Sequence, residues 1–290
     1  MSSFNTLLHY YNRVFYSFPL TFNLFFNIIL FGDFMLQKII GKTKRAIEDF
    51  NMIDEGDKIA VGLSGGKDSI TLLYALYYLQ KFYKKHFTIM AITIHTGSNN
   101  FDTTDLKRIC DELGIEYIVF NSNIADVVFN IRKEENPCSL CANMRRGMLN
   151  SLAVEHGCTK VALGHHMDDV METFMMSLLL NGRIHTFAPV TYLSRSNVKT
   201  IRPMIYVEEK LIRAVAREKN FPVHPKTCPA DGFTKRDYMS DLIHNLQKDI
   251  PRIKEHIFGA IKRSKIDGWY KEPLEEKLDT AVNENEENLD

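Results

Sequence analysis

Apolar and polar positions divide most of the chain into alternating strands and helices. Apolar runs of strand length predict strands at Lys58–Leu63, Phe87–His95, Glu116–Phe120 and Lys160–Leu163. Helical spacing predicts helices at Ser69–Lys81, Thr103–Leu113, Cys141–His156 and Asp168–Leu180. Strands separated by crossover helices form right-handed βαβ units. The pattern therefore predicts an α/β fold, with a parallel twisted sheet and helices on both of its faces.

The rest of the chain has one more strand and then only helices. The strand is expected near Thr200–Met204, and the helices at Glu208–Asn220, Thr234–Gln247 and Arg252–Lys265. We therefore expect five segments: an apolar N-terminal extension (1–34), an N-terminal helix (35–56), an α/β domain (57–206), a helical C-terminal part (207–270) and an acidic tail (271–290). The tail is poor in apolar residues, so it is expected to be disordered.

The N-terminal extension contains an uncharged run, Val14–Gly32, that is rich in Phe, Leu and Ile. A membrane span needs about 20 apolar residues, but Pro19 and Asn23 interrupt this run. Only Arg13 precedes it as a nearby positive charge. We expect neither a membrane span nor a signal peptide. A cleaner helical pattern starts at Met35, so the extension is either a packed or loosely docked segment or the product of an upstream start codon.

Charge is distributed unevenly, although the formal net charge is zero. From Glu272 to Asp290 the tail has eight acidic residues and one basic residue, a net charge of −7. Residues 1–271 hold 35 basic and 28 acidic residues, a net charge of +7. A basic body suits a polyanionic partner such as RNA. Pairs such as Arg145–Arg146 and Lys235–Arg236 are either ordinary solvated surface or contacts with RNA phosphates.

Five cysteines occur in a chain without a convincing secretory signal. Such usage is typical of a reducing compartment, so we expect a cytoplasmic protein without a disulfide framework. Cys110 and Cys158 lie in apolar patterns and are expected to be small core residues. The other three, Cys138, Cys141 and Cys228, need another explanation.

A glycine-rich loop follows the first expected strand and has the sequence Ser64-Gly65-Gly66-Lys67-Asp68-Ser69. Two consecutive glycines let the backbone turn tightly and approach an anion, and the amides at a helix start point toward it. The loop lacks the G-x-x-x-x-G-K-S/T spacing of kinase-like phosphate loops, so transfer of a γ-phosphoryl group is not indicated. It resembles the SGGxDS signature of the PP-loop ATP pyrophosphatases. That resemblance implies that ATP loses pyrophosphate and that Lys67 and Asp68 handle phosphate charge and Mg²⁺.

A second polar element, Gly164-His165-His166-Met167-Asp168-Asp169, ends the fourth strand at the same sheet edge as the glycine-rich loop. From the residues alone it is either a metal site or a helix cap, with Asp168 placed as the N-cap residue. It is similar to the family's GHxxDD-like element, which implies that Asp169 lies near ATP or its Mg²⁺. Gly164 and His165 are then expected in the nucleotide site, although packing is the alternative for both histidines.

A C-x-x-C pair, Cys138 and Cys141, stands at the start of an expected helix, where thiolates are favoured. Alone it fits a redox pair, half of a zinc site or part of an iron–sulfur site. A structural zinc needs four ligands and a second C-x-x-C is missing from the sequence. A thioredoxin-like role is disfavoured because the pair does not follow the first strand of such a fold. With Cys228 the pair supplies three thiolates, which fit a [4Fe-4S] cluster whose fourth iron stays open.

Several motifs together resemble the tRNA 2-thiocytidine synthetases over roughly residues 36–265. They are Ser64–Ser69, Cys138–Cys141 followed by Arg145-Arg146-Gly147, Gly164–Asp169, Ile201-Arg202-Pro203-Met204 and Cys228. The resemblance implies an ATP-dependent tRNA sulfurtransferase that adenylates C2 of a cytidine in the anticodon loop and releases AMP. It implies catalytic roles for Asp68 and for Cys138, Cys141 and Cys228 as cluster ligands. It also implies a homodimer and a sulfur donor such as a cysteine desulfurase.

One departure from that family keeps two alternatives open. Its members carry a downstream C-x-x-C, whereas this chain has Cys228 alone. The first alternative is another PP-loop enzyme, either a thiouridine synthetase or an amide-forming ligase. The second is a non-catalytic nucleotide or iron–sulfur redox sensor, which would bind ATP without releasing pyrophosphate.

Overall fold

The computed structural model describes residues 34–97, 102–132, 137–194, 197–223 and 234–270, and all side chains in these ranges except that of Cys138. The expected extension up to residue 33, the acidic tail and Cys228 lie outside the described residues. Within the described ranges, no helix is both long and apolar enough to cross a membrane.

Six strands form one sheet in the order β3-β2-β1-β4-β6-β5. They are β1 (Asp57–Gly62), β2 (Phe87–His95), β3 (Glu116–Asn121), β4 (Lys160–Ala162), β5 (Val190–Leu193) and β6 (Val198–Ile201). All neighbouring pairs are parallel except β5 and β6, which are antiparallel at one edge. The expected α/β fold is confirmed. Because parallel strands end at the same edge of a sheet, the loops after β1, β4 and β6 meet there.

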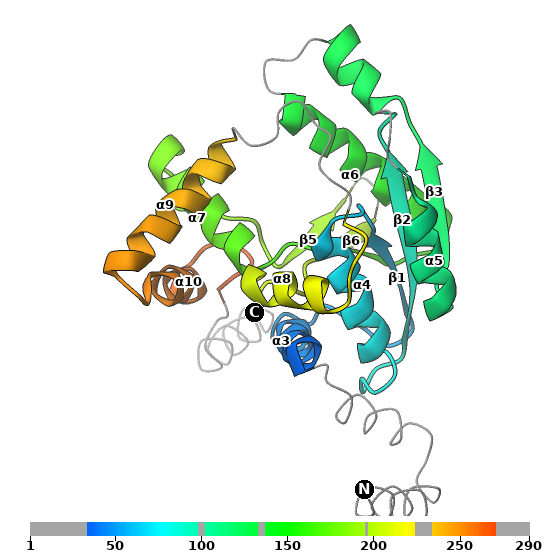
Figure 1. Ribbon diagram of the computed structural model, residues 1–290, viewed down its shortest axis with the longest axis horizontal. Helices are drawn as coiled ribbons and strands as arrows, with labels where there is room; N and C mark the ends of the chain where they lie inside the picture. Colours follow the sequence, from blue (N-terminus) through cyan, green and yellow to red (C-terminus); the bar gives the residue numbers. More distant parts are fainter. Residues whose placement is uncertain (1–33, 98–101, 133–136, 195–196, 224–233, 271–290) are drawn as a thin grey trace, which may run out of the picture.

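The helices are α3 (Phe34–Asp49), α4 (Lys67–Leu79), α5 (Thr104–Leu113), the π-helix η1 (Asp126–Ile131), α6 (Pro137–Glu155), α7 (Met167–Asn181), α8 (Glu209–Glu218), α9 (Lys235–Asp249) and α10 (Ile253–Arg263). In Figure 1, α7, α9 and α10 gather to the left of the sheet, while α8 lies near α3 and α4. The helices that follow β6 therefore pack beside the α/β domain.

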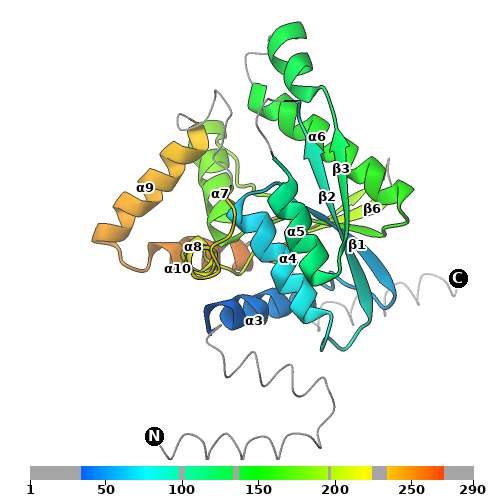
Figure 2. The ribbon, with the colours of Figure 1, turned by 45° about the vertical axis from the view of Figure 1, so that its right-hand side comes forward.

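Neighbouring residues of each strand enter two different cores. Ile59 and Val61 of β1 pack into the core that α3, α4 and α5 share, whereas Ala60 between them packs with Leu149 and Ala153 of α6. Figure 2 shows α4 and α5 on one side of the strands and α6 on the other. Strands covered on both faces need apolar residues at nearly every position, which explains the continuous apolar runs in the sequence.

Three local features differ from, or add to, the expected elements. The strand β5 and the π-helix η1 were not predicted, since β5 has only four residues and η1 matches no regular helical period. Helix α6 starts at Pro137, earlier than expected, so the C-x-x-C pair lies within its first five residues. Proline suits the first position of a helix because its missing N–H would be unsatisfied there. Cys110 and Cys158 are buried, which confirms them as core residues.

A buried ion cluster joins the first residues of β1 and β4, at the sheet edge opposite the loops described below. Lys160 Nζ lies 2.5 Å from Asp57 Oδ2 and 2.7 Å from Asp54 Oδ2. Asp57 also accepts hydrogen bonds from Asp54 N and Thr159 Oγ1, both at 2.6 Å. Since a buried charge without a partner is costly, Asp57 is required wherever Lys160 is buried.

The Asp57→Ala variant should lower the free energy of unfolding by about 3 kcal/mol or more, because it leaves the buried Lys160 ammonium with Asp54 alone. Urea denaturation followed by circular dichroism measures this change. The matched control is Asp111→Ala, which removes the exposed ion pair with Lys107 and should cost less than about 1 kcal/mol. Equal losses in the two variants would contradict the importance of the buried cluster.

Candidate functional site

The loop between β1 and α4 forms a cradle of backbone amides. Gly65 has a φ of +79°, which residues with a Cβ rarely adopt, and Gly66 is the N-cap residue of α4. Ser69 Oγ accepts hydrogen bonds from Ser64 N and Ser64 Oγ, both at 3.1 Å, and donates to the Gly66 carbonyl at 2.9 Å. Together the turn and the helix start offer backbone N–H groups and the helix dipole to an anion such as phosphate.

Next to this cradle, the side chain of Lys67 is paired with two carboxylates. Lys67 Nζ lies 3.0 Å from both carboxylate oxygens of Asp68 and 3.0 Å from Glu209 Oε1. Burial by itself would lower the pKa of Lys67, but these two carboxylates outweigh it and raise that pKa. Lys67 is therefore positively charged, and a phosphate in the cradle would meet a cation already held by two carboxylates.

The loop after β4 packs directly against the cradle. A Cβ on Gly164 would lie 3.1 Å from the carbonyl carbon of Asp68 and 3.2 Å from the amide nitrogen of Ser69. A Cβ contact this close would make the neighbouring backbone shift by a few tenths of an ångström, so glycine suits this position. This approach brings the two polar elements of the sequence to one place.

The N-cap residue of α7 is His166, so the expectation that Asp168 caps this helix was wrong. His166 N donates to Asp169 Oδ2 at 2.9 Å, and Asp169 N donates to His166 Nδ1 at 3.4 Å, which is a capping box. His166 Nε2 lies 3.6 Å from Asp68 Oδ1. The imidazole thereby connects the helix cap to the cradle.

Helices that follow β6 brace the two carboxylates in the first turn of α7. Asp168 accepts from the backbone nitrogen of Glu209 at 2.7 Å and from Lys254 Nζ at 2.6 Å. Asp169 Oδ1 accepts from Arg236 Nη1 at 2.7 Å. One donor therefore comes from each of α8, α9 and α10. The position of both carboxylates depends on the C-terminal helices.

One cavity of about 400 Å³ joins these elements. Its lining residues are Gly62, Leu63, Ser64, Asp68, Ser69, Ile92, Ile94, Ala142, Arg145, Arg146, Leu149, Leu163, Gly164, His165, Asp169 and Arg202. The cradle supplies an anion site, and Ile92, Ile94 and Leu149 supply apolar surface that suits the ring of a nucleotide base. The cavity can therefore hold a nucleotide with its phosphates in the cradle.

Burial shifts the pKa of three titratable groups around the cavity. It lowers the pKa of His165 to about 4, so this imidazole is neutral near pH 7, and its ring packs 4.9 Å from that of Phe187. It lowers the pKa of Arg202 to about 10. Burial, followed by the charge of Asp169, raises the pKa of Glu172 to about 7. Glu172 is thus partly protonated at neutral pH.

Comparison with known proteins agrees with this geometry. The PP-loop domain family matches residues 35–225. The tRNA-cytidine(32) 2-sulfurtransferase of Geobacter metallireducens is 37% identical over 228 residues, which cover 78% of this chain and 89% of that protein. The enzyme of the same name from Dichelobacter nodosus is 39% identical over 79% of this chain and 85% of that protein. This chain belongs to the tRNA-cytidine(32) 2-sulfurtransferase family.

A solved structure extends the family comparison to three dimensions. The U34-tRNA thiolase NcsA from Methanococcus maripaludis, solved with its [4Fe-4S] cluster, superposes with a TM-score of 0.62. It shares 28% identity with the sulfurtransferase chain described here, and 78% of each chain is covered. The three-dimensional similarity is therefore to a protein that thiolates tRNA.

Most expected site residues of this sulfurtransferase family member come together at the cavity. Six of them line it: Ser64, Asp68, Ser69, Gly164, His165 and Asp169. Gly65, Gly66 and Lys67 form the adjoining loop. Cys141 is half-buried in α6 beside the lining residue Ala142. The side chains of Cys138 and Cys228 lie outside the described part of the chain, so the expected convergence of three thiolates stays a prediction.

Two expected basic pairs have different surroundings. Arg145 and Arg146 line the cavity, as expected for the mouth of a substrate site. Arg236 instead binds Asp169 and Thr173. Sequence reasoning assigned no role to Arg202, Glu209 or Lys254. Arg202 directly follows β6, and ligands of parallel sheets bind beyond the carboxyl ends of the strands, so its position in the sequence could have pointed to the site. Glu209 and Lys254 reach the site only through tertiary packing.

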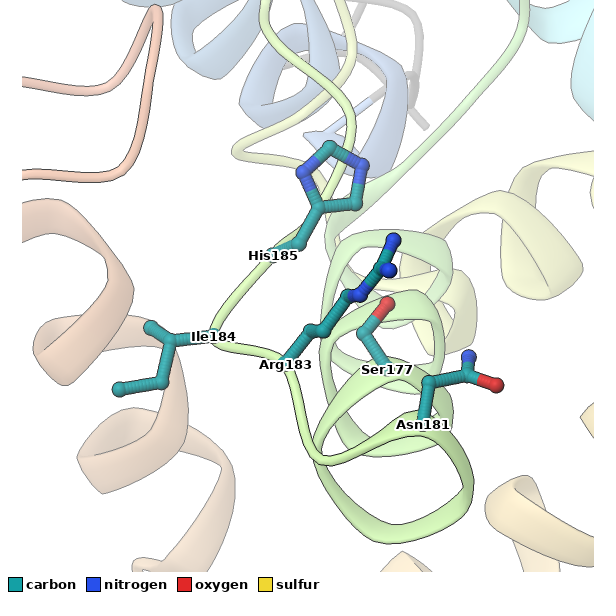
Figure 3. Close-up of a pocket in the computed structure, with 5 residues that line it drawn as sticks. All are labelled: Ser177, Asn181, Arg183, Ile184 and His185. Carbon is teal, nitrogen blue, oxygen red and sulfur yellow. The ribbon is translucent and has the colours of Figure 1, made fainter.

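A larger cavity, about 850 Å³, lies at the C-terminal end of α7, away from the cradle. The described residues that line it are Ser177, Asn181, Arg183, Ile184 and His185. Figure 3 shows Ile184 pointing away from Arg183 and His185. None of these five residues belongs to the cradle or to the first turn of α7. Its size alone therefore does not make it the reaction site.

Glu172 makes the stability of this sulfurtransferase chain depend on pH. Its folded pKa of about 7 lies above the ordinary glutamate value of 4.5, so the folded state binds the extra proton and wild-type stability falls as pH rises through this window. Relative to wild type, Glu172→Gln should gain stability by up to about 3 kcal/mol between pH 4.5 and pH 8. Urea denaturation across this range measures it. Exposed Glu112→Gln is the control, and parallel pH curves for Glu172→Gln and wild type would contradict the burial argument.

Proposed function

We propose that this protein is an ATP-dependent tRNA sulfurtransferase that adenylates C2 of a cytidine in the anticodon loop and replaces its oxygen by sulfur. The observation that carries the proposal is the shared cavity, where the phosphate cradle, the Asp169 loop and the arginines of α6 face one space. Membership of the tRNA-cytidine(32) 2-sulfurtransferase family supports position 32 as the site of the modified cytidine.

The chemistry follows from where the phosphates would lie. With pyrophosphate in the Ser64–Ser69 cradle, the α-phosphorus of ATP faces the cavity, where the substrate base can approach. The C2 oxygen attacks this phosphorus, the bond to pyrophosphate breaks, and the base becomes an adenylate. Lys67 stabilises the charge that develops on pyrophosphate. Sulfur then displaces AMP, which leaves with the former C2 oxygen.

Three thiolates, from Cys138, Cys141 and Cys228, would hold a [4Fe-4S] cluster. The donor set fits because three cysteines leave one iron open, and the half-buried Cys141 lies on α6 next to the cavity wall. When bound, the cluster would supply the sulfur at C2. The tRNA thiolase with a cluster among the structural relatives supports this assignment.

Further parts of the proposal concern the metal, the partners and the location. Asp68 and Asp169 both line the cavity, and carboxylate oxygens together with phosphate oxygens are the ligands that Mg²⁺ prefers. We therefore infer that they hold the Mg²⁺ that accompanies ATP. The family resemblance further supports a homodimer and a sulfur donor such as a cysteine desulfurase. An enzyme that modifies tRNA works where tRNA is, in the cytoplasm.

The Asp68→Ala variant tests the adenylation step. It should abolish AMP formation and tRNA thiolation while the iron content stays unchanged, since Asp68 belongs to the cradle and not to the cysteine helix. Release of pyrophosphate with bulk tRNA, and mass spectrometry of the tRNA nucleosides, measure the two losses. The exposed Asp111→Ala variant is the control. Wild-type protein that binds ATP yet releases no pyrophosphate with tRNA would favour the non-catalytic sensor instead.

Replacing Cys138, Cys141 or Cys228 by Ala should remove the cluster. Anaerobically reconstituted wild-type protein is expected to hold about four irons per chain and to show a broad charge-transfer absorption. Each of the three variants should lose both properties, while Cys110→Ala and Cys158→Ala should keep them because these thiols are buried in the cores. Stoichiometric zinc without iron in protein prepared without oxygen would exclude the proposed cluster.

A further inference from the structure

Three arginines line the cavity without an ion pair to any carboxylate of the described residues. They are Arg145, Arg146 and Arg202. Across the part of the chain that the structure describes, none of the three forms an ion pair. The two cavity carboxylates differ in this respect, because Asp68 pairs with Lys67 and Asp169 pairs with Arg236. The cavity therefore has a surplus of positive charge on its arginine side.

Arg202 is the unusual member of this group, since only 5% of it is exposed. Its Nη1 donates to the Ala188 carbonyl at 2.7 Å and to Thr191 Oγ1 at 3.0 Å, which fixes the guanidinium plane. Its Nε is buried and has no hydrogen-bond partner among the described residues. A buried cation is costly unless an anion neutralises it.

Arg146 adds a second positive charge close to the first. It is exposed on α6, and its Nη2 donates to Asn143 Oδ1 at 2.6 Å. Its charge contributes, after burial, to the lowered pKa of Arg202. The two positive charges repel each other, and an anion bound between them would offset this repulsion.

We propose that Arg202 and Arg146 form a phosphate subsite, separate from the Ser64–Ser69 cradle, for a phosphate group of the nucleotides that meet in the cavity. Planar guanidinium groups suit phosphate oxygens because they donate two parallel hydrogen bonds. The phosphate is either the α-phosphate of the adenylate or a backbone phosphate of the RNA substrate. This inference rests on the proposed function.

The position of the subsite agrees with a second phosphate. Arg202 follows β6, which is separated from β1 by β4, so it starts about 10 Å across the sheet from the cradle. Arg146 lies on the helix that carries Cys141. A phosphate held by these two arginines would therefore lie in the same cavity as the cradle and next to the cysteine helix.

Binding measurements on the full chain test the subsite in two arms. The variants are Arg202→Gln and Arg146→Gln, and exposed Arg217→Gln on α8 is the control. The first arm compares the affinity for AMP with that for adenosine, because the ratio isolates the contribution of the phosphate. The second arm measures the affinity for purified bulk tRNA as a function of salt. Melting temperatures report folding, and Arg146→Gln carries the test if Arg202→Gln does not fold.

Each variant should lose about tenfold in one arm, because a charge-assisted hydrogen bond to phosphate is removed. A lower ratio of AMP to adenosine affinity assigns the subsite to the adenylate. Weaker tRNA binding, with a salt slope reduced by about one, assigns it to an RNA phosphate. Folded variants that match Arg217→Gln in both arms would overturn the subsite. Failure of wild-type protein to thiolate tRNA would overturn the proposed function and leave these binding results unaffected.

Discussion

The close approach of Gly164 to the first residues of α4 is the contact on which the site depends. It brings the β4–α7 loop within van der Waals distance of the backbone of Asp68 and Ser69. A Cβ at residue 164 would make an unusually tight contact, and the backbone of Asp68 and Ser69 would have to shift by a few tenths of an ångström. The parallel sheet brings both loops to one edge, and the missing Cβ lets them approach closely.

Charge pairing extends this contact to the C-terminal helices. Asp168 and Asp169 would repel each other and any phosphate in the cradle if they were left alone. Lys254 and Arg236 neutralise them from α10 and α9. The helices after β6 therefore help to position the candidate site, although the polar motifs themselves all lie in the α/β domain. The boundary expected at residue 206 therefore divides the sequence but not the site, because the Arg236–Asp169 and Lys254–Asp168 ion pairs join the two parts.

The sequence predicted the sheet well because strands covered on both faces are apolar throughout, and such runs are easy to recognise. Six expected site residues line the cavity for a related reason: they lie in the loops and first helical turns that follow β1 and β4, and these meet at one edge of the sheet. The misses have a different origin. Asp168 looked like the cap of α7, but His166 takes that position and leaves Asp168 to bind Lys254. The roles of Glu209 and Lys254 depend on how distant helices dock, which no local pattern encodes.

The two sides of the cavity differ in charge. Beside Asp169 the buried groups carry little charge, whereas the positive charge of the arginines on the other side has no ion-pair partner among the described residues. His165 is neutral, and Glu172 is partly protonated near pH 7, so neither adds a full charge beside Asp169. The arginine side has no equivalent neutralisation among the described residues. A polyanionic substrate gains most where positive charge is already desolvated, because part of the cost of burial is met in folding. The asymmetry thus favours a substrate that brings a phosphate to the arginine side, as an RNA strand can.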